Sequence, residues 1–364
     1  MIFNIMRRFL FALALFCAIS CSGGKSSVPV SDDSWSSSLS MTVDRIWGER
    51  YSAFPSIVEY RGAYYVSFRE AESHIFDSKG IAEGKTRILR SEDGVSWESV
   101  ALMGIPELDL RDPKLSVTAD GRLMVMMGGS RYVEKKLMGC VPHVSFSIDG
   151  KKFSEPEPVI YDDASDYEWF WRVTWHDGAG YTVTYGKGGE SNFALLKTAD
   201  GIRYEKITDI DVPGFPNETT IRFLPDGRMA MLIRRDPREG DPEETACWGF
   251  SSYPFTDWSV KELGFRIGGP EFIVLDDGSI VAGGRSYVNG DQRTFLWKGT
   301  AEGEFTPFAV LPSKGDNSYP GFLVAGDELW TVYYSSHESP AQGRARARIY
   351  LSRMSLDYVK SYPL

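Results

Sequence analysis

Cysteine is scarce in this sequence, and its scarcity limits the kinds of site that the chain can build. Only four cysteines occur in 364 residues, and two of them, Cys17 and Cys21, fall in an N-terminal leader. The other two, Cys140 and Cys247, stand far apart in strand-like segments. An exported protein can form a disulfide, but we expect two separate buried thiols. The chain also has no C-x-x-C or H-E-x-x-H pattern, so the sequence predicts no zinc site and no metal or other cofactor.

Two further features are missing: an excess of basic charge and a helical repeat. The chain carries 40 Lys and Arg against 50 Asp and Glu, a net charge of −10, and its pI is about 5.1. Nucleic acids and anionic membrane surfaces are bound through clustered basic residues, so neither is expected as a partner. No amphipathic helical periodicity of useful length occurs. The composition, with 42% apolar and 13% aromatic residues, is that of a globular protein long enough to bury a large core.

The first 40 residues differ in composition from the rest. Two arginines precede an apolar run over residues 9–19 that is too short to span a membrane. The run ends in small residues before Cys21, which resembles a bacterial lipoprotein signal, although Ala18 stands where leucine is usual. The resemblance implies a signal peptide over residues 1–21 and lipidation of the Cys21 thiol; the alternative is an ordinary secretory signal. Residues 22–40, rich in Ser, Gly, Asp and Pro, are typical of a flexible tether. We therefore expect an exported bacterial lipoprotein, at the outer membrane, at the cell surface or in the periplasm, that meets the membrane only through its lipid.

Residues 41–364 repeat one pattern six times. Each copy has an apolar run, a tight turn of Gly or Asp-Gly type and a second apolar run, and the turns fall about 50 to 60 residues apart. That spacing is too long for a helical solenoid and suits a four-stranded blade. The sequence therefore predicts an all-β fold, a six-bladed β-propeller formed as one domain, with residues 41–48 as the strand that closes the last blade. The copies begin at Phe54, Asp112, Trp171, Asn217, Pro270 and Tyr319.

A second element recurs in the outer half of the first three copies. It reads Ser/Thr-x-Asp-Gly-x-x-aromatic, as SEDGVSW, SIDGKKF and TADGIRY, over residues 91–97, 147–153 and 198–204. The Asp and Ser/Thr side chains can cap backbone N–H groups of the turn, the glycine permits a positive φ, and the aromatic ring packs between outer strands. The element resembles the Asp-box (BNR) repeats of sialidases, although it is one residue shorter than their commonest form. The resemblance implies a six-bladed propeller, with these turns on the face opposite the active site.

At the other face of such a propeller, the strand ends carry charged and aromatic residues. Arginines, carboxylates and aromatic rings that converge there suit an anionic or polyhydroxylated ligand; the alternative is that the charges only pair with one another. We expect a glycan as the ligand of this face, and a monomeric protein. The residues are Arg69, Glu70, Arg111, Asp112, Arg131, Trp171, Arg172, Glu218, Arg234, Glu271, Arg285, Tyr319 and His337.

The fourth copy, NETTIRFLPDGRMAMLIR, carries the closest match to a sialidase site. Folded as a hairpin, it brings Glu218 and Arg234 to the same end. Sialidases place a glutamate and an arginine at this position and spacing, and their nucleophilic tyrosine opens the last blade, where Tyr319 lies here. The resemblance implies that Tyr319 is the nucleophile, that Glu218 accepts its proton, and that Arg234 belongs to an arginine triad for the substrate carboxylate. Another triad arginine is implied at Arg293, with Arg285 as its rival.

The opening blade matches less well. The resemblance implies that Asp77, in REAESHIFDSKG, takes the role of the sialidase acid/base aspartate, with His74 and Glu70 of the same loop as alternatives. The first triad arginine should precede Ile-Pro, but Ala53 stands in that place. A sialic acid would then lose one charge-assisted hydrogen bond, worth about 1.5–3 kcal/mol, unless a nearby arginine replaces it.

The sequence therefore predicts a retaining, exo-acting glycosidase that removes a terminal, acidic sugar. A tyrosine nucleophile suits such a sugar because a carboxylate nucleophile would be repelled by it. One alternative is a glycan-binding propeller without catalysis. The other is a glycosidase for a different sugar that uses a pair of carboxylates, drawn from Glu70, Asp112, Glu218 and Glu271.

Overall fold

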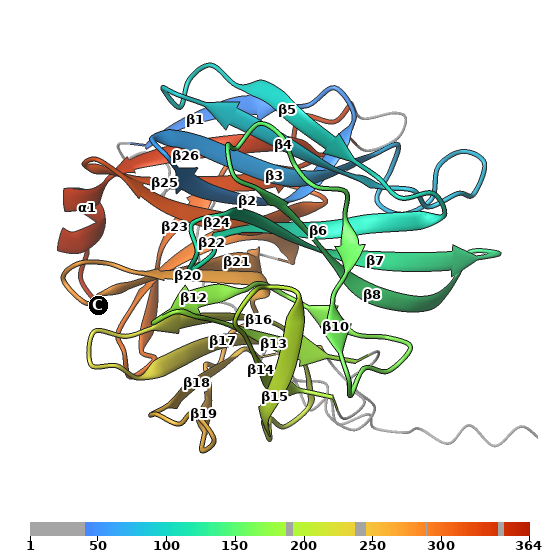
Figure 1. The fold of residues 1–364 in the computed structure, drawn as a ribbon. Coiled ribbons are helices and arrows are strands. Elements are labelled where there is room, and N and C mark those ends of the chain that lie inside the picture. Colours follow the sequence, from blue (N-terminus) through green and yellow to red (C-terminus); the bar gives the residue numbers. More distant parts are fainter. Residues whose placement is uncertain (1–40, 187–191, 237–244, 289, 341–345) are drawn as a thin grey trace, which may run out of the picture.

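The computed structural model describes residues 41–186, 192–236, 245–288, 290–340 and 346–364. The chain forms six β-sheets arranged as blades around a common axis (Figure 1). The all-β, six-bladed propeller predicted from the repeats is therefore confirmed. The expected signal peptide, Cys21 and the tether lie outside the described residues. Within those residues the one helix is α1 (Leu356–Ser361), and no helix is long and apolar enough to cross a membrane.

The first three blades follow one another along the chain, and their innermost strands pack around the axis. Blade 1 consists of β2 (Tyr51–Tyr60), β3 (Ala63–Ala71), β4 (Lys85–Ser91) and β5 (Glu98–Met103). Blade 2 consists of β6 (Leu108–Val117), β7 (Leu123–Val133), β8 (Lys136–Ser147) and β9 (Glu157–Pro158). Blade 3 is less regular, because two short inner strands, β11 (Trp169–Phe170) and β12 (Thr174–His176), both pair with β13 (Ala179–Tyr185). The blade continues outward with β14 (Ala194–Thr198), β15 (Arg203–Asp209) and β10 (Ile160–Tyr161).

The last three blades complete the ring, and the last one also takes in the first strand of the chain. Blade 4 consists of β16 (Phe215–Phe223), β17 (Met229–Asp236), β18 (Cys247–Ser251) and β19 (Ser259–Glu262). Blade 5 consists of β20 (Gly268–Val274), β21 (Ile280–Val288), β22 (Asp291–Gly299) and β23 (Phe305–Leu311). Blade 6 consists of β24 (Asn317–Ala325), β25 (Glu328–Ser335), β26 (Arg348–Ser355) and β1 (Met41–Trp47). The antiparallel pairing of β1 with β26 confirms the closing strand predicted at residues 41–48.

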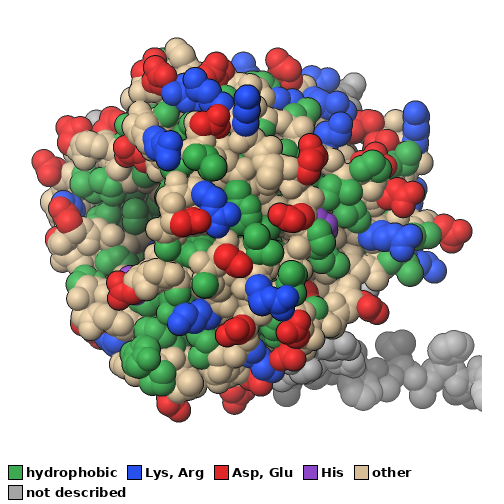
Figure 2. Space-filling model, in the orientation of Figure 1, with side chains coloured by type: hydrophobic (Ala, Val, Ile, Leu, Met, Phe, Trp, Pro, Cys, Tyr) green, Lys and Arg blue, Asp and Glu red, His purple; other side chains and the backbone are tan. Residues whose placement is uncertain are grey.

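The core lies between the blades, where apolar side chains of neighbouring sheets interdigitate. The central strands of the blades are buried on both faces. Nearly every residue of β13 and β17 is buried, and Val183 and Leu232 are 0% exposed. Cys140 and Cys247 are buried free thiols, which confirms that they do not pair. On the outer surface drawn in Figure 2, Lys and Arg side chains are interspersed with Asp and Glu side chains.

The three Ser/Thr-x-Asp-Gly turns have the hydrogen bonds expected of them. Asp93 Oδ1 accepts from the backbone N–H groups two and three residues ahead, both at 2.8 Å, and Ser91 Oγ accepts from the glycine N–H at 2.8 Å. The same bonds recur around Asp149 and Asp200. In blade 1, Ser91 pairs with Tyr64 at the start of β3. The turn therefore lies at the face opposite the one where β3 ends, which is the face that carries the cavity described next.

Candidate active site

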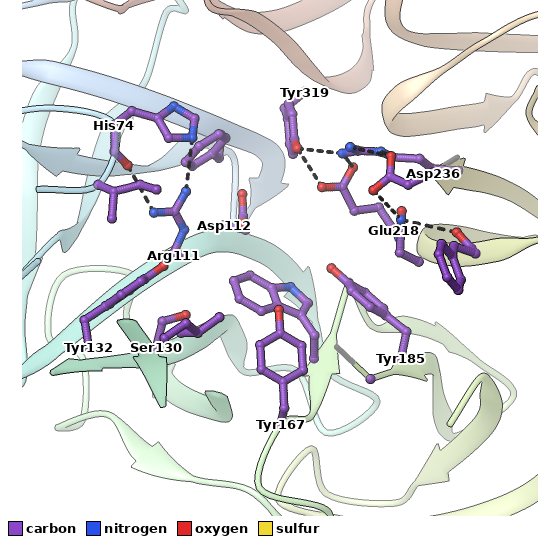
Figure 3. A pocket seen from close by; sticks show the side chains of 18 residues that line it. His74, Arg111, Asp112, Ser130, Tyr132, Tyr167, Tyr185, Glu218, Asp236 and Tyr319 are labelled. Carbon is purple, nitrogen blue, oxygen red and sulfur yellow. Dashed lines mark hydrogen bonds and ion pairs between the residues drawn. The ribbon is translucent and has the colours of Figure 1, made fainter. Parts of the chain in front are cut away.

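A cavity of about 310 Å³ opens where the second strands of the blades end, with walls from blades 1, 2, 3, 4 and 6 (Figure 3). Its size and its mixture of aromatic rings with a few polar groups are those of a small-ligand site. Among the described residues, no group of three or more His, Cys, Asp or Glu side chains is placed to hold a metal ion. The polar side chains of the cavity are His74, Arg111, Asp112, Ser130, Asn217, Glu218, Arg234 and Asp236, and its aromatic rings are Phe54, Tyr132, Tyr167, Trp169, Tyr185, Phe215 and Tyr319.

β-bulges in the innermost strands aim several of these side chains. In four blades, the bulge holds a residue with positive φ directly before a proline: Phe54 (64°), Asp112 (48°), Gly269 (62°) and Tyr319 (52°). A bulge breaks the alternation of side chains along a strand and re-aims one of them. A residue other than glycine in this region is strained by about 1–3 kcal/mol, and such strain gathers at functional sites. Phe54, Asp112 and Tyr319 all line the cavity.

Glu218, Tyr319 and Arg234 form a hydrogen-bonded cluster, and Figure 3 shows Glu218 and Tyr319 on one side of the cavity. The Tyr319 hydroxyl donates to Glu218 Oε1 at 2.6 Å. Arg234 Nη1 donates to Glu218 Oε2 at 2.8 Å and to the Tyr319 oxygen at 3.2 Å, and the Gly269 N–H donates to Glu218 Oε2 at 2.8 Å. Burial opposes the charge on Glu218, but Arg234 and the hydrogen bonds outweigh it and hold its pKa below the usual value. Glu218 is therefore a carboxylate placed to accept the Tyr319 proton.

The ring of Tyr319 is packed between aromatic rings, an arginine side chain and a glycine of the neighbouring blade. Its centroid lies 4.9 Å from that of Phe54 and 5.5 Å from that of Trp171. The Arg285 guanidinium lies 5.6 Å from the same ring, and a Cβ on Gly269 would come within 2.5 Å of it. Burial first, and the charge of Glu218 second, raise the pKa of Tyr319 well above its usual value. The hydroxyl is thus protonated at rest and needs a base to become a nucleophile.

Arg111 and His74 form the opposite wall (Figure 3). Arg111 Nη1 donates to the His74 carbonyl at 3.0 Å and to Asp109 Oδ2 at 3.1 Å. His74 Nδ1 lies 2.7 Å from Asp316 Oδ2 and 2.8 Å from the Tyr51 hydroxyl. The cavity therefore has a guanidinium and an imidazole facing the Tyr319 side, each fixed by a carboxylate.

Asp112 lies between the two walls (Figure 3). The buried Lys114 lies close enough for its charge to act on this carboxyl. The Asp112 Oδ1 atom has no hydrogen-bond partner among the described residues, and burial raises the pKa of this carboxyl. Lys114 Nζ donates to the Phe54 carbonyl at 3.2 Å and lies 5.7 Å from the centroid of the Tyr319 ring. Burial and the charge of Arg172 lower the pKa of Lys114 to about 7.

Arg69 and Glu70, both predicted to bind substrate, do not line the cavity. Arg69 is fully buried and forms an ion pair with Asp109, with Nε 2.6 Å from Oδ1. Glu70 accepts two hydrogen bonds from Arg87, at 2.8 and 2.9 Å, and one from Trp47 Nε1 at 2.9 Å. Both side chains form ion pairs with neighbouring strands, so they stabilise the structure around the cavity and do not face it.

The pair Arg172 and Glu271 is likewise internal. The two side chains bond to each other, and Glu271 Oε1 also accepts from Arg222 at 2.5 Å. Trp171 is 1% exposed, donates from Nε1 to the Pro270 carbonyl at 3.4 Å, and packs against the Tyr319 ring. None of the three residues predicted here lines the cavity.

The two rival arginines of blade 5 are separated by the structure. Arg285 lies beside the Tyr319 ring. Arg293 pairs with Asp291 at 3.4 Å and is not among the residues that line the cavity. His337, also predicted to bind substrate, lies outside the cavity with Nδ1 2.9 Å from a serine hydroxyl of β25. Of the rivals, Arg285 is therefore the one that contacts the candidate nucleophile.

Asp77 does not face the cavity and belongs to a separate hollow of about 220 Å³. Its Oδ1 accepts from the N–H groups of Lys79 and Ile81, both at 2.8 Å, so the carboxylate caps its own loop. These backbone hydrogen bonds lower its pKa, the opposite of what an acid catalyst needs. Among the four carboxylates considered for a catalytic pair, Glu218 and Asp112 are the two that line the cavity.

Several cavity residues were not anticipated from the sequence. Tyr132 stands on the long β7–β8 hairpin, and Tyr167, Trp169 and Tyr185 line the blade 3 side, where the rings of Trp169 and Tyr185 stack at 6.3 Å and 27°. The signal for Tyr167 and Trp169 is the run DYEWFW over residues 166–171, which leads into the third copy. The signal for Asp316 is its place three residues before Tyr319.

No protein-family model and no curated protein matches the chain. Solved structures do. A protein of unknown function from Dyadobacter fermentans is 17% identical, with a TM-score of 0.69 over 86% of this chain and 99% of that one. The alpha-L-arabinanase of Penicillium chrysogenum complexed with arabinobiose is 15% identical, with a TM-score of 0.62 over 87% and 98%. The Trypanosoma rangeli sialidase in complex with the inhibitor DANA is 13% identical, with a TM-score of 0.61 over 84% and 55%.

At these identities the likeness concerns the fold. The match spans the arabinanase almost from end to end and about half of the longer sialidase chain. The chain is a six-bladed β-propeller of the architecture that solved sialidases and arabinanases share.

Proposed function

We propose that the protein is a retaining glycoside hydrolase that removes a terminal sugar from a glycan, with Tyr319 as the nucleophile and Glu218 as its base. The observation that carries the proposal is the 2.6 Å hydrogen bond from the Tyr319 hydroxyl to Glu218 Oε1 in a cavity of small-ligand size. The solved structures that share the fold include glycosidases for different sugars, which supports the reaction class.

The geometry supplies each part of such a reaction. Glu218 takes the hydroxyl proton as the Tyr319 oxygen attacks the anomeric carbon and the bond from that carbon to the leaving oxygen breaks, so no free phenolate has to form. Arg234 Nη1, 3.2 Å from that oxygen, stabilises the negative charge that develops on it. Water then releases the sugar from the tyrosine, and two displacements at the same carbon give net retention.

We propose an acidic sugar as the preferred substrate. Arg111 and Arg234 line the cavity on opposite sides, and Arg285 lies beside the nucleophile ring. Ala53 is fully buried, and the bulge that follows it turns Phe54 toward the cavity in its place. The two arginines that line the cavity are one fewer than a three-arginine clamp would supply, and each missing charge-assisted hydrogen bond weakens binding by about 1.5–3 kcal/mol.

A neutral sugar cleaved by a carboxylate pair is the second candidate, and Asp112 is the observation that favours it. Asp112 and Glu218 both line the cavity, and the raised pKa of Asp112 suits a general acid. The Arg234 guanidinium also bonds to Asp236 at 2.8 Å, which leaves it fewer N–H groups for a substrate carboxylate.

The test is release of product from a panel of aryl glycosides, covering sialosides, uronides, arabinofuranosides and hexosides, with the anomeric product followed by proton NMR. We expect retention, and we expect Tyr319→Phe and Glu218→Gln each to lower kcat by about 10²–10⁴-fold, the size of a lost acid–base or nucleophilic step. Tyr253→Phe, at a ring that is 83% exposed, is the matched control and keeps the wild-type rate.

Other outcomes decide between the alternatives. Activity that survives Tyr319→Phe but not Asp112→Asn would favour the carboxylate pair. Inversion of configuration would rule out the covalent intermediate. Glycan binding without turnover of any substrate would show that the propeller is a binding protein and that the enzyme proposal is wrong.

A further inference from the structure

Beside the cavity, His74, Asp316 and Tyr51 form a hydrogen-bonded group that the mechanism above does not use. His74 Nδ1 lies 2.7 Å from Asp316 Oδ2, and the Tyr51 hydroxyl bonds to both partners. Tyr334 donates to the other Asp316 oxygen at 2.7 Å. Burial opposes the charge on Asp316, but the hydrogen bonds from His74, Tyr51 and Tyr334 outweigh it and keep its pKa below the usual value. An ionised carboxylate therefore holds Nδ1 of the imidazole.

With Nδ1 held in this way, Nε2 is the remaining ring nitrogen at the cavity wall, where it accepts a hydrogen bond from Arg111 Nη2 at 3.5 Å. The side chain is 46% exposed and lines the cavity wall opposite Tyr319 (Figure 3). The His74 ring packs edge-on against Phe54 with centroids 5.5 Å apart, and the Tyr319 ring packs against the same Phe54 at 4.9 Å. The Phe54 ring thus contacts both the imidazole and the nucleophile ring, so His74 and Tyr319 border the same part of the cavity.

The charges that face His74 act in opposite directions. Asp316, from the turn before β24, and Asp112, from β6, favour a protonated imidazole. Arg111, also from β6, disfavours it, since its Nη2 lies 3.5 Å from Nε2. Tyr51, from β2, contributes a neutral hydroxyl, because burial and Asp316 raise its pKa above the usual value. An imidazole set between opposed charges is suited both to give and to take a proton.

We propose that His74, positioned by Asp316, is the general acid and base of this site; the inference rests on the glycosidase function proposed above. The two carboxylates that could compete for the role are less well placed. Asp77 caps its own loop outside the cavity. Asp112 lines the cavity, but its Oδ1 is buried without a hydrogen-bond partner among the described residues, so no neighbour holds that oxygen in place for proton transfer.

The proton inventory closes with the groups present. In the first step, the His74 Nε2 proton goes to the glycosidic oxygen as its bond to the anomeric carbon breaks, Tyr319 oxygen bonds to that carbon, and the tyrosine proton goes to Glu218. In the second step, neutral Nε2 takes a proton from water, the water oxygen bonds to the anomeric carbon, the bond to Tyr319 breaks, and Glu218 returns its proton to the tyrosine. Asp316 stays ionised throughout, bonded to Nδ1–H.

The dependence on the leaving group tests this assignment. The sugar that the wild type turns over is offered with a dinitrophenyl group, which leaves without a proton, and with an alkyl or sugar group, which needs one. His74→Gln is expected to lose about 10²–10⁴-fold in kcat/KM on the unactivated substrate, and to lose little on the dinitrophenyl glycoside. Its kcat on the dinitrophenyl glycoside is expected to fall, because hydrolysis of the glycosyl-tyrosine lacks its base. Azide, a nucleophile that needs no base, is expected to restore this kcat through a glycosyl azide.

A second variant separates chemistry from structure. Asp316→Asn removes the charge that favours the imidazolium, so the basic limb of the pH profile on the unactivated substrate is expected to move to lower pH; a merely structural role would lower the rate at every pH alike. Asp77→Asn keeps the oxygen that caps its loop and is the control, expected to retain both activities. Circular dichroism establishes that each variant is folded.

Each other result counts against a specific claim. Equal losses of His74→Gln on both substrates, with normal turnover by the wild type, overturn this inference and leave the proposed function standing. Leaving-group dependence in Asp112→Asn instead of His74→Gln overturns it as well and assigns the role to Asp112. A wild type that turns over no glycoside refutes the proposed function, and this inference falls with it.

Discussion

The buried ion pair between Arg69 and Asp109 gives a sharp test of how the His74 wall of the cavity is held. Both side chains are 0% exposed, and Arg69 Nε and Nη2 donate to the two carboxylate oxygens at 2.6 and 3.0 Å. The Gly84 N–H and Arg111 Nη1 also donate to Asp109, at 3.0 and 3.1 Å. The substitution Asp109→Ala would therefore leave four N–H groups without their acceptor and the Arg69 cation buried without its counter-charge.

The expected magnitude follows from that geometry. Removing one partner of a buried ion pair destabilises a protein by about 3–5 kcal/mol. Since 1 kcal/mol corresponds to about 2–4 °C in domains of 150–250 residues and to less in larger ones, we expect the Tm of Asp109→Ala to fall by roughly 5–10 °C in a calorimetric scan. The matched surface control is Asp162→Ala, which breaks a pair 3.5 Å long to Arg203 at an 87% exposed side chain and is expected to cost about 0–1 kcal/mol.

The effect also carries a pH dependence with a definite sign. Burial opposes ionisation of Asp109, but the charges of Arg69 and Arg111 overcome it and lower its pKa. A carboxyl pKa that is lower in the folded state contributes stability above the unfolded pKa of about 3.9, and this stability is lost as the pH falls through the folded value. The Tm difference between wild type and Asp109→Ala is therefore expected to be largest near neutral pH and to shrink in acid. An Asp109→Ala protein as stable at pH 7 as Asp162→Ala would refute the reasoning.

Two further predictions concern the surroundings of Tyr319. Burial and Arg172 lower the pKa of Lys114 to about 7 in the folded protein, against about 10.4 when unfolded, so the folded state binds fewer protons between these pH values. The stability of the wild type relative to Lys114→Met should therefore rise from pH 7 to pH 10 in Tm measurements. A Tm difference that does not change with pH would contradict the shift. Gly269→Ala places a Cβ within 2.5 Å of the Tyr319 ring at a φ of 62°, so we expect a large loss of kcat. The control is Gly278→Ala, which has a φ of 81° and no atom within 4 Å of the new Cβ. It should share only the backbone strain of about 1–2 kcal/mol and keep its activity.

The fold could be predicted because its signals are local. An Asp-Gly turn and the alternation of apolar residues are set by neighbours in sequence, and six copies at blade spacing leave few other architectures. Glu218 and Arg234 were predicted for the same reason, since a hairpin of known turn fixes which residues meet at its mouth. The lipoprotein leader and the lipidation of Cys21 stay predictions.

The rest of the site could not be predicted because it depends on departures from regular strands. The alternation of β2 gives no sign that a bulge turns Phe54, with a positive φ, into the cavity next to the buried Ala53. Asp77 and His74 lie three residues apart in one loop, and only its three-dimensional path decides which faces the cavity. Glu70 does not line the cavity and pairs with Arg87 of the neighbouring strand, a partner that no motif reveals.

The closure of blade 6 has a consequence for how the protein is made. Met41 of β1 pairs with Met354 of β26, more than 300 positions later. A ribosome that adds about 5–20 residues per second therefore leaves β1 without a partner for roughly a quarter of a minute to a minute. The strand is only half-buried even when paired, and Asp44 and Arg45 point to solvent, a pattern that discourages a waiting strand from pairing with another chain. Although β1 is synthesised before the other strands of the propeller, it can pair only after β26 has been made. The propeller can therefore close only after blade 6 has been synthesised.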